Sequence, residues 1–356
     1  MNWMGTGIRA AISVTLLAFL LANVDIGQVL VPLSTASVPW LALALASALA
    51  AWVINTAKWS VLLAALERRL SYFYLLALNF VGMFYSMVLP GQIGGEVVKG
   101  IRLARYGVAP SDAALSIAAD RLTGLIGLAL LGVAGVLLAE TVPASQAMLI
   151  LASGVVATAG ALLLLGRLRS PSPARANEAG EPTVQGRIRS GMEAAWTTWA
   201  AYARSPALLG MVILQAVTFQ ALVTLSNYLV ARSVGVEISI VALAWIVSAV
   251  SLVHLLPISL AGLGVREGAY VMLLQQYGVP PAEGLALSLA VFLVILAQAL
   301  LGGALELFWS GLEPQLLRTL MDSDGRRTPG PVPVPDPSEP PNDMVREPRA
   351  LPPQTG

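Results

Sequence analysis

The 356-residue sequence contains no cysteine, one histidine and few charged residues. The absence of cysteine excludes disulfide bonds, thiolate metal sites and cysteine nucleophiles, and His254 alone cannot form a histidine cluster for a metal ion. Charged residues make up only 12% of the chain, whereas a soluble domain carries about 25%. The formal net charge of +1 argues against a protein that binds nucleic acid through its phosphates. We therefore expect no metal, no cofactor and no nucleic-acid partner.

Long apolar runs take the place of the missing charge. Hydrophobic residues make up 56% of the sequence, and the mean hydropathy is +0.75. A helix that spans a membrane needs about 20 mostly apolar residues, and glycines inside such runs, as at Gly127, Gly135 and Gly302, are typical of close helix packing in lipid. The sequence predicts an all-α polytopic membrane protein. Its hydrophobic segments are Ile8–Val24, Val38–Ile54, Tyr72–Leu89, Ala113–Ala139, Ala144–Leu165, Ala207–Ala231, Ile238–Leu256 and Gly284–Trp309.

Two parts of the chain lack the composition of a spanning helix. Residues 167–205 are a polar linker that ends in an amphipathic stretch, which is typical of a helix lying on the membrane surface. Residues 312–356 are dominated by proline and charge, which predicts a disordered cytoplasmic tail. We predict one transmembrane domain over residues 1–311, with the linker on its cytoplasmic side and an uncleaved first helix.

The distribution of lysine and arginine predicts the orientation, because cytoplasmic loops of membrane proteins are enriched in both. The stretch Lys58–Arg69 places the loop after the second segment in the cytoplasm, and both termini with it. The basic stretch Lys99–Arg105 conflicts with simple alternation of the spans. The conflict disappears if Tyr72–Leu89 enters from the cytoplasm, breaks at Pro90 and returns as a re-entrant hairpin. The alternative is that Pro90 is an ordinary kink in a plain spanning helix.

The hairpin sequence recurs later in the chain. Leu-Pro-Gly-Gln-Ile-Gly-Gly-Glu ends at Glu96, and Leu-Pro-Ile-Ser-Leu-Ala-Gly-Leu-Gly-Val-Arg-Glu ends at Glu267, 171 positions later. Tyr106 and Tyr277, each followed by Gly-Val, have the same separation. Three predicted spans lie between the copies, and an odd number inverts the second hairpin. Inverted repeats with broken helices near the bilayer midplane are typical of secondary transporters. The predicted fold therefore has about six spanning helices plus two oppositely oriented re-entrant helical hairpins.

Glycines and basic residues gather at the two predicted hairpin tips. Glycine leaves backbone N–H groups accessible where a helix begins, and such groups bind anions, phosphate among them. Lysine and arginine add fixed positive charge there. We predict that the substrate is bound by Gly91, Gly94, Gly95, Lys99, Arg121, Gly262, Gly264 and Arg266.

Three carboxylates, those of Glu96, Asp120 and Glu267, are predicted to serve proton or charge coupling. A carboxylate within the membrane is expensive to keep charged, which suits proton binding and release. Lys99 and Arg266 oppose this, because a nearby cation favours the ionised form.

Asp120 and Arg121 are adjacent on one helix and so need separate partners. We expect Asp120, placed near the start of the long helix, to pair with Lys99 or Arg102. Arg121 is expected to pair with Glu96 or with a lipid phosphate. The alternative is that these charges form interhelical ion pairs that only fix the fold.

The two Leu-Pro motifs, together with the Asp120-Arg121-Leu sequence, resemble the flippase module of bacterial lysylphosphatidylglycerol synthases and their stand-alone relatives. The resemblance covers roughly Gly7 to Gly311. It implies that a phospholipid or a polyprenyl-linked lipid moves between the leaflets of the cell membrane. Glu96 stands where many relatives have aspartate, which keeps the charge and alters its reach.

The chain resembles the transport half alone, because neither the linker nor the tail has the apolar periodicity of the soluble aminoacyl-transferase domain. It contains no Gly-x-x-x-x-Gly-Lys-Ser/Thr loop, so a flippase of this sequence would not use ATP directly. We expect a transporter that binds a membrane lipid and has a possible lipid-synthesising enzyme as partner. The alternatives are a membrane-embedded lipid-modifying transferase of the phosphatidylglycerol lysyltransferase type, and a non-catalytic partner subunit of such an enzyme.

Overall fold

The computed structural model describes residues 24–89, 94–139, 205–254 and 264–311, and the regular elements in these ranges are all α-helices. Four of them are long and apolar enough to cross a membrane. Each coincides with a predicted segment, which confirms the all-helical membrane class. The predicted span Ala144–Leu165 and all of Ile8–Val24 except Val24 lie outside the described residues, as do most of the linker and all of the tail. The four long helices are α3 (Val38–Ala65), α6 (Pro110–Leu138), α9 (Pro206–Ser233) and α12 (Pro281–Gly311).

Shorter helices make up the rest of the described chain. Asp25 caps the first of them, because its carboxylate accepts a hydrogen bond from Gly27 N at 2.8 Å. The predicted helix breaks at Pro90 and Pro257 lie outside the described residues, so the helices on either side of each break are described separately. The shorter helices are α2 (Ile26–Ser34), α4 (Tyr72–Val88), α5 (Gly94–Arg105), α10 (Ile240–His254) and α11 (Val265–Gln275).

Long and short helices follow one another in the same order twice. The set α3–α4–α5–α6 has lengths of 28, 17, 12 and 29 residues, and the set α9–α10–α11–α12 has lengths of 28, 15, 11 and 31 residues. The turn after the third helix has one geometry in both sets, since Gly107 and Gly278 adopt φ angles of 80° and 76°. The next valine donates its N–H to a leucine carbonyl five positions earlier, at 3.1 and 3.3 Å. Glycine adopts such angles at little cost, which explains the Gly-Val pair in each copy.

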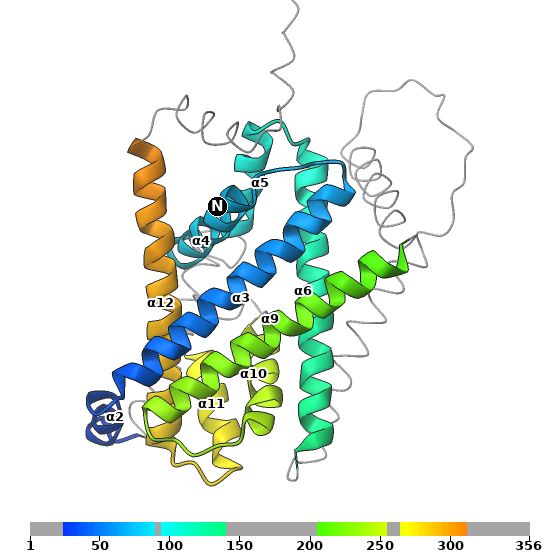
Figure 1. Cartoon of the computed structure of the whole chain (residues 1–356). Coiled ribbons are helices and arrows are strands. Elements are labelled where there is room, and N and C mark those ends of the chain that lie inside the picture. Colours follow the sequence, from blue (N-terminus) through cyan, green and yellow to red (C-terminus); the bar gives the residue numbers. More distant parts are fainter. Residues whose placement is uncertain (1–23, 90–93, 140–204, 255–263, 312–356) are drawn as a thin grey trace, which may run out of the picture.

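The two sets pack around a central pair of antiparallel helices, α3 and α9 (Figure 1). Ser47 Oγ donates a hydrogen bond to the Leu222 carbonyl at 2.9 Å, and Ser226 Oγ donates to the Ala44 carbonyl at 2.8 Å. Each central helix therefore supplies one donor and one acceptor to the other. The outer helices α6 and α12 stand on opposite sides of this pair and also run in opposite directions (Figure 1).

Each outer helix packs against a short helix of the other set, α6 against α10 and α12 against α4. Glycine permits both approaches. A Cβ added at Gly135 would lie 2.7 Å from the backbone nitrogen of Trp245, and one added at Gly302 would overlap the carbonyl oxygen of Phe80. The predicted role of glycine in close helix packing is confirmed at these two positions.

The short helices of each set form a helical hairpin. In α4–α5, Gly95 lies so close to α4 that a Cβ would overlap the α4 backbone, and the rings of Tyr74 and Tyr106 lie 4.5 Å apart. In the second hairpin, α10 packs against α11, and Trp245 Nε1 donates to the hydroxyl of Tyr277 at 2.6 Å. The two hairpins lie toward opposite ends of the molecule (Figure 1).

Two helix boundaries differ from the prediction. Helix α3 continues to Ala65 rather than ending near Ile54, so Lys58 is buried inside a long helix and does not mark a cytoplasmic loop. Helix α6 begins at Pro110, so Asp120 lies about three turns inside it rather than near its start. Both errors have one cause. Lys58 and Asp120 each interrupt the apolar pattern of their helix, but their charges compensate each other across the two helices.

The contact at Gly302 leads to a stability prediction. Gly302→Ala is expected to destabilise the protein by about 1–3 kcal/mol, because the new methyl group must push α12 away from the α4 backbone. The midpoint of thermal unfolding in detergent measures this. Gly268→Ala is the matched control, because a Cβ at Gly268 meets no atom within 4 Å. An equal midpoint for both variants would contradict the close approach of α12 to α4.

Candidate functional site

A cavity of about 430 Å³ lies where the two helix sets meet, and all eight of their helices contribute to its wall. Its volume falls within the range of roughly 300–1,000 Å³ that small-molecule sites occupy. The wall combines charged and amide side chains with aromatic and aliphatic ones. The lining residues are Trp52, Asn55, Lys58, Asn79, Gly82, Met83, Ser86, Met87, Glu96, Lys99, Asp120, Arg121, Gly124, Leu125, Leu128, Phe219, Gln220, Ser251, Arg266, Phe292 and Ile295.

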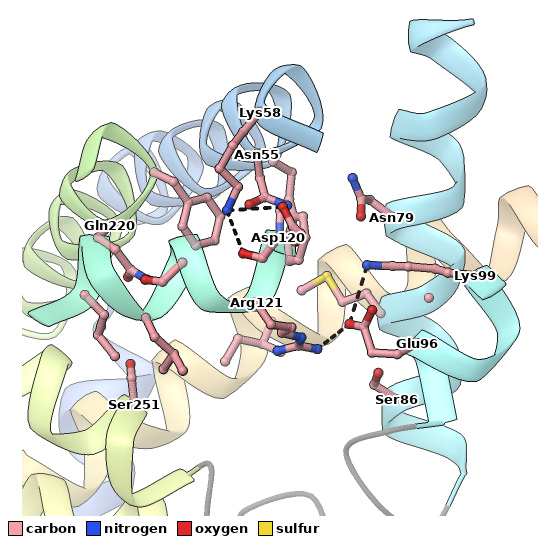
Figure 2. Close-up of a pocket in the computed structure, with 18 of the residues that line it drawn as sticks. Asn55, Lys58, Asn79, Ser86, Glu96, Lys99, Asp120, Arg121, Gln220 and Ser251 are labelled. Carbon is pink, nitrogen blue, oxygen red and sulfur yellow. Dashed lines mark hydrogen bonds and ion pairs between the residues drawn. The ribbon is translucent and has the colours of Figure 1, made fainter. Parts of the chain in front are cut away.

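One side of the cavity carries the ion pair Lys58–Asp120, which joins α3 to α6 (Figure 2). Lys58 Nζ lies 3.1 Å from Asp120 Oδ1 and donates to the Asp120 backbone carbonyl, also at 3.1 Å. The Lys58 side chain is 1% exposed. The expected pairing of Asp120 with Lys99 or Arg102 was wrong, because the crossing of α3 and α6 brings a cation 62 positions away into contact.

The opposite side carries a second charge cluster centred on Glu96 (Figure 2). Its carboxylate accepts a hydrogen bond from the Arg121 guanidinium, which confirms the expected Glu96–Arg121 pairing. Lys99 Nζ lies 3.6 Å from the same carboxylate oxygen and 5.2 Å from the centre of the Trp59 ring. Two cations therefore favour the ionised form of Glu96, and its proposed exchange of a proton stays a prediction.

Arg266 and Glu267 bring charge from the second hairpin. The guanidinium of Arg266 pairs with Glu267 and lies 4.9 Å from the ring of Phe292. The other carboxylate oxygen of Glu267 accepts a hydrogen bond from Gly264 N at 2.6 Å, which caps the start of α11. Arg266 is 5% exposed and lines the cavity, yet its Nε has no partner among the described residues.

The charges at the cavity do not balance. Four basic and two acidic side chains line it, and Glu267, which pairs with Arg266, adds a third carboxylate. The site therefore carries a net charge of +1. Asn79 Oδ1 is a further buried cavity atom that lacks a partner in the described part of the chain. The excess positive charge and the unpartnered Nε donor of Arg266 favour an anionic ligand with hydrogen-bonding oxygens, whereas the Asn79 oxygen would accept from a donor group of the ligand.

Two of the glycines predicted to bind substrate, Gly94 and Gly95, are closely packed against neighbouring residues. Gly94 lies against Leu89 and Gly95 against α4, where a side chain would overlap either neighbour. The amide of Gly264 is occupied by the carboxylate of Glu267. Gly91 and Gly262 lie outside the described residues. Fixed side-chain charge, rather than open backbone amides, therefore dominates the described part of the site.

A third cluster, which the sequence analysis missed, holds the first hairpin to α12. Arg102 Nη2 lies 2.5 Å from both carboxylate oxygens of Glu306, and the hydroxyl of Tyr85 donates to the same group at 3.1 Å. The Arg102 guanidinium also lies 5.1 Å from the centre of the Trp309 ring. Glu306 was a visible signal, since it is an acidic residue within an apolar helix. Such residues usually pair with another charge.

A comparison with known protein families found a match that covers most of the chain. Residues 8–303 match the model of a family described as "Lysylphosphatidylglycerol synthase TM region". The match confirms the resemblance carried by the two Leu-Pro motifs and covers the helices that form the cavity up to Gly303. A search of curated proteins found no match. In the described part of the chain, no three histidine, aspartate or glutamate side chains are placed to hold a metal ion.

Proposed function

Because the chain belongs to the lysylphosphatidylglycerol synthase transmembrane-region family, we propose that it is a flippase for an anionic membrane lipid. The substrate class is a phospholipid or a polyprenyl-linked lipid that carries a phosphate. Its head group occupies the central cavity while it passes from one leaflet to the other. The protein acts in the cell membrane with both termini in the cytoplasm.

The net positive charge of the central cavity is the observation that carries this proposal. A phosphate brings negative charge and several acceptor oxygens, and these suit Arg121, Lys99 and the unpartnered Nε of Arg266. Both hairpins contribute to this wall, through α4 and α5 on one side and through α10 and α11 on the other. A head group in the cavity therefore contacts both hairpins, which lie toward opposite ends of the molecule (Figure 1).

The arrangement of the helices supports transport across the membrane. The same four-helix order occurs twice, the central helices α3 and α9 are antiparallel, and the hairpins lie at opposite ends (Figure 1). We interpret this as an inverted repeat whose hairpins re-enter the membrane from opposite faces. Such repeats let one substrate site open to either side in turn.

The inverted arrangement predicts that equivalent positions of the two hairpins lie on opposite sides of the membrane. Arg105 and Gln276 are both exposed and are separated by the repeat offset of 171 positions. In the cysteine-free chain, a cysteine at position 105 should react with a membrane-impermeant maleimide only from the cytoplasmic side, and one at position 276 only from outside. Labelling of both positions from one side would contradict the inverted repeat.

The proposed activity is tested with purified protein in liposomes. Phosphatidylglycerol that carries a fluorescent head-group-proximal label is placed in both leaflets, and dithionite added outside destroys only the accessible label. Active protein should make the inner label accessible without added ATP, and zwitterionic phosphatidylcholine should move more slowly. Mass spectrometry of the recovered lipids tests the transferase alternative. An enzyme would be favoured over a flippase if the lipid were chemically altered and the inner label became accessible no faster than in liposomes without protein.

A further inference from the structure

A second hollow, of about 770 Å³, lies on the outer side of the Glu96–Arg121 ion pair, between α5 and α6. We call it the α5–α6 groove. Glu96 and Arg121 are the two residues that line both this groove and the central cavity. The ion pair thus forms the boundary between the two hollows.

The walls of the two hollows differ in chemistry. Apart from the ion pair, the groove is lined only by apolar and small residues, and its floor is formed by residues with little or no side chain, such as Gly100, Ala114 and Ala118. A Cβ at Gly100 would meet only Ile117 Cδ1, at 3.8 Å, so open space remains above this position. Val97, which is 53% exposed, stands at the groove's rim.

Arg121 is unusual for a charged residue on such a surface. Its side chain is 52% exposed, although the groove around it is apolar and α6 is long and apolar enough to span the membrane. A charge exposed beside hydrocarbon is costly unless it finds water or a counter-ion. One carboxylate, that of Glu96, already contacts it, and the remaining exposed N–H groups are open to a second anion at the boundary.

A single ligand that fills both hollows must be amphipathic. Its anionic part would lie in the cavity and its apolar part in the groove. Resting on the flippase proposal above, we infer that the α5–α6 groove holds an acyl chain of the transported lipid, with its phosphate next to Arg121. The head group then enters the cavity from the lipid through the lateral opening between α5 and α6, while the acyl chain stays in the α5–α6 groove.

The groove fixes the position of the chain more than it adds affinity. Lipid tails are as apolar as the groove wall, so no hydrophobic driving force favours the groove over the surrounding lipid. The shape of the groove decides whether an acyl chain occupies it, because the small residues leave space along about 12 Å of α5, from Glu96 to Ala104. Blocking the groove should therefore affect lipids with a long chain and spare those whose chain does not reach it.

Photo-crosslinking in liposomes tests the location of the chain. Phosphatidylglycerol with a diazirine in one long acyl chain should label residues 97–104 and 110–118 more strongly than other apolar surface. The exposed residues Leu137 and Leu138, at the far end of α6, give the background of random lipid contact. Labelling of residues 97–118 at or below this background would overturn the assignment.

A groove-filling variant tests its role in transport. Ala118→Trp should slow the flipping of long-chain phosphatidylglycerol by about tenfold or more, because the indole ring occupies the groove. Dihexanoyl phosphatidylglycerol, whose chains are short, should be affected much less. Ala221→Trp is the matched control, because Ala221 is exposed on α9 and lines neither hollow.

The two experiments separate this inference from the proposed function. Crosslinks in the groove without any flipping by the wild-type protein would retain the acyl-chain site and contradict the flippase. Flipping by the wild type that Ala118→Trp does not slow, with crosslinks spread over other surfaces, would retain the flippase and contradict the groove. If Ala118→Trp fails to fold, the crosslinking of the wild type decides alone.

Discussion

Replacing Arg121 with glutamine is expected to slow the translocation of phosphatidylglycerol by about ten- to a hundredfold. A hydrogen bond to a charged group contributes about 1.5–3 kcal/mol, and each 1.4 kcal/mol corresponds to about a tenfold change. The variant should still fold, because Arg121 is half exposed and Glu96 keeps Lys99 at 3.6 Å. The dithionite assay measures the rate, and gel filtration in detergent verifies that the protein remains monodisperse.

Two further variants make this result specific. Arg121→Lys keeps the charge but loses the planar fork that binds two phosphate oxygens, so an intermediate rate is expected. Arg105→Gln removes an arginine from an exposed position of the same hairpin that lines neither hollow, and should transport at the wild-type rate. Wild-type transport by Arg121→Gln would mean that the cation serves only the Glu96 ion pair and that the head group binds elsewhere.

Lys58→Met is expected to have the largest effect on stability. Removing one partner of a buried ion pair costs about 3–5 kcal/mol, since the other charge remains without compensation. Lys58 is 1% exposed and Asp120 is 15% exposed, so water can relieve the remaining carboxylate only in part. The midpoint of thermal unfolding in detergent should fall well below that of Gly302→Ala.

The double variant Lys58→Met/Asp120→Asn provides the decisive comparison. It removes both charges, so most of the lost stability should return, because no uncompensated charge is left in the buried site. If the double variant is as unstable as the single one, the loss comes from packing around the Lys58 stem instead. Transport by the double variant then reports separately whether this pair also serves the head group.

The sequence predicted those parts of the fold that depend on local pattern. The apolar runs identified all four long helices of the described chain, because about 20 consecutive apolar residues are informative without knowledge of their neighbours. The Gly-Val pairs were part of the predicted repeat, and Gly107 and Gly278 do adopt similar positive φ angles. The Glu96–Arg121 contact was predictable for a related reason, because the two residues are only 25 positions apart, one on the first hairpin and one on the helix that follows it.

Ion pairs between distant segments could not be predicted in this way. The partners Lys58 and Asp120 are 62 positions apart, and Arg102 and Glu306 are 204 positions apart. Which charges meet depends on how α3 crosses α6 and where α12 passes the first hairpin, and hydropathy carries no such information. Lys58 was misassigned to a loop for the same reason, since a lysine looks exposed until its partner is known.

The surroundings of the predicted site glycines illustrate a second limit. A glycine before a helix indicates that the backbone is accessible, but not what reaches it first. At Gly264 the side chain of Glu267, three residues ahead, takes the amide, and at Gly95 the neighbouring helix fills the space. The α5–α6 groove could not be predicted for the converse reason, because it forms between small residues of two separate helices, such as Gly100 on α5 and Ala114 on α6.

The two serine hydrogen bonds between α3 and α9 have a consequence for how this protein tolerates mutation. In both of them the acceptor is a backbone carbonyl, of Leu222 or of Ala44, and every amino acid carries that group. Sequence drift at position 222 therefore leaves its bond intact, and drift at position 44 is limited only by the volume available at a fully buried site. Ser47 and Ser226 supply the side-chain groups that these two hydrogen bonds require. The two halves of the chain can thus diverge in sequence while the hydrogen bonds between α3 and α9 that join them are kept.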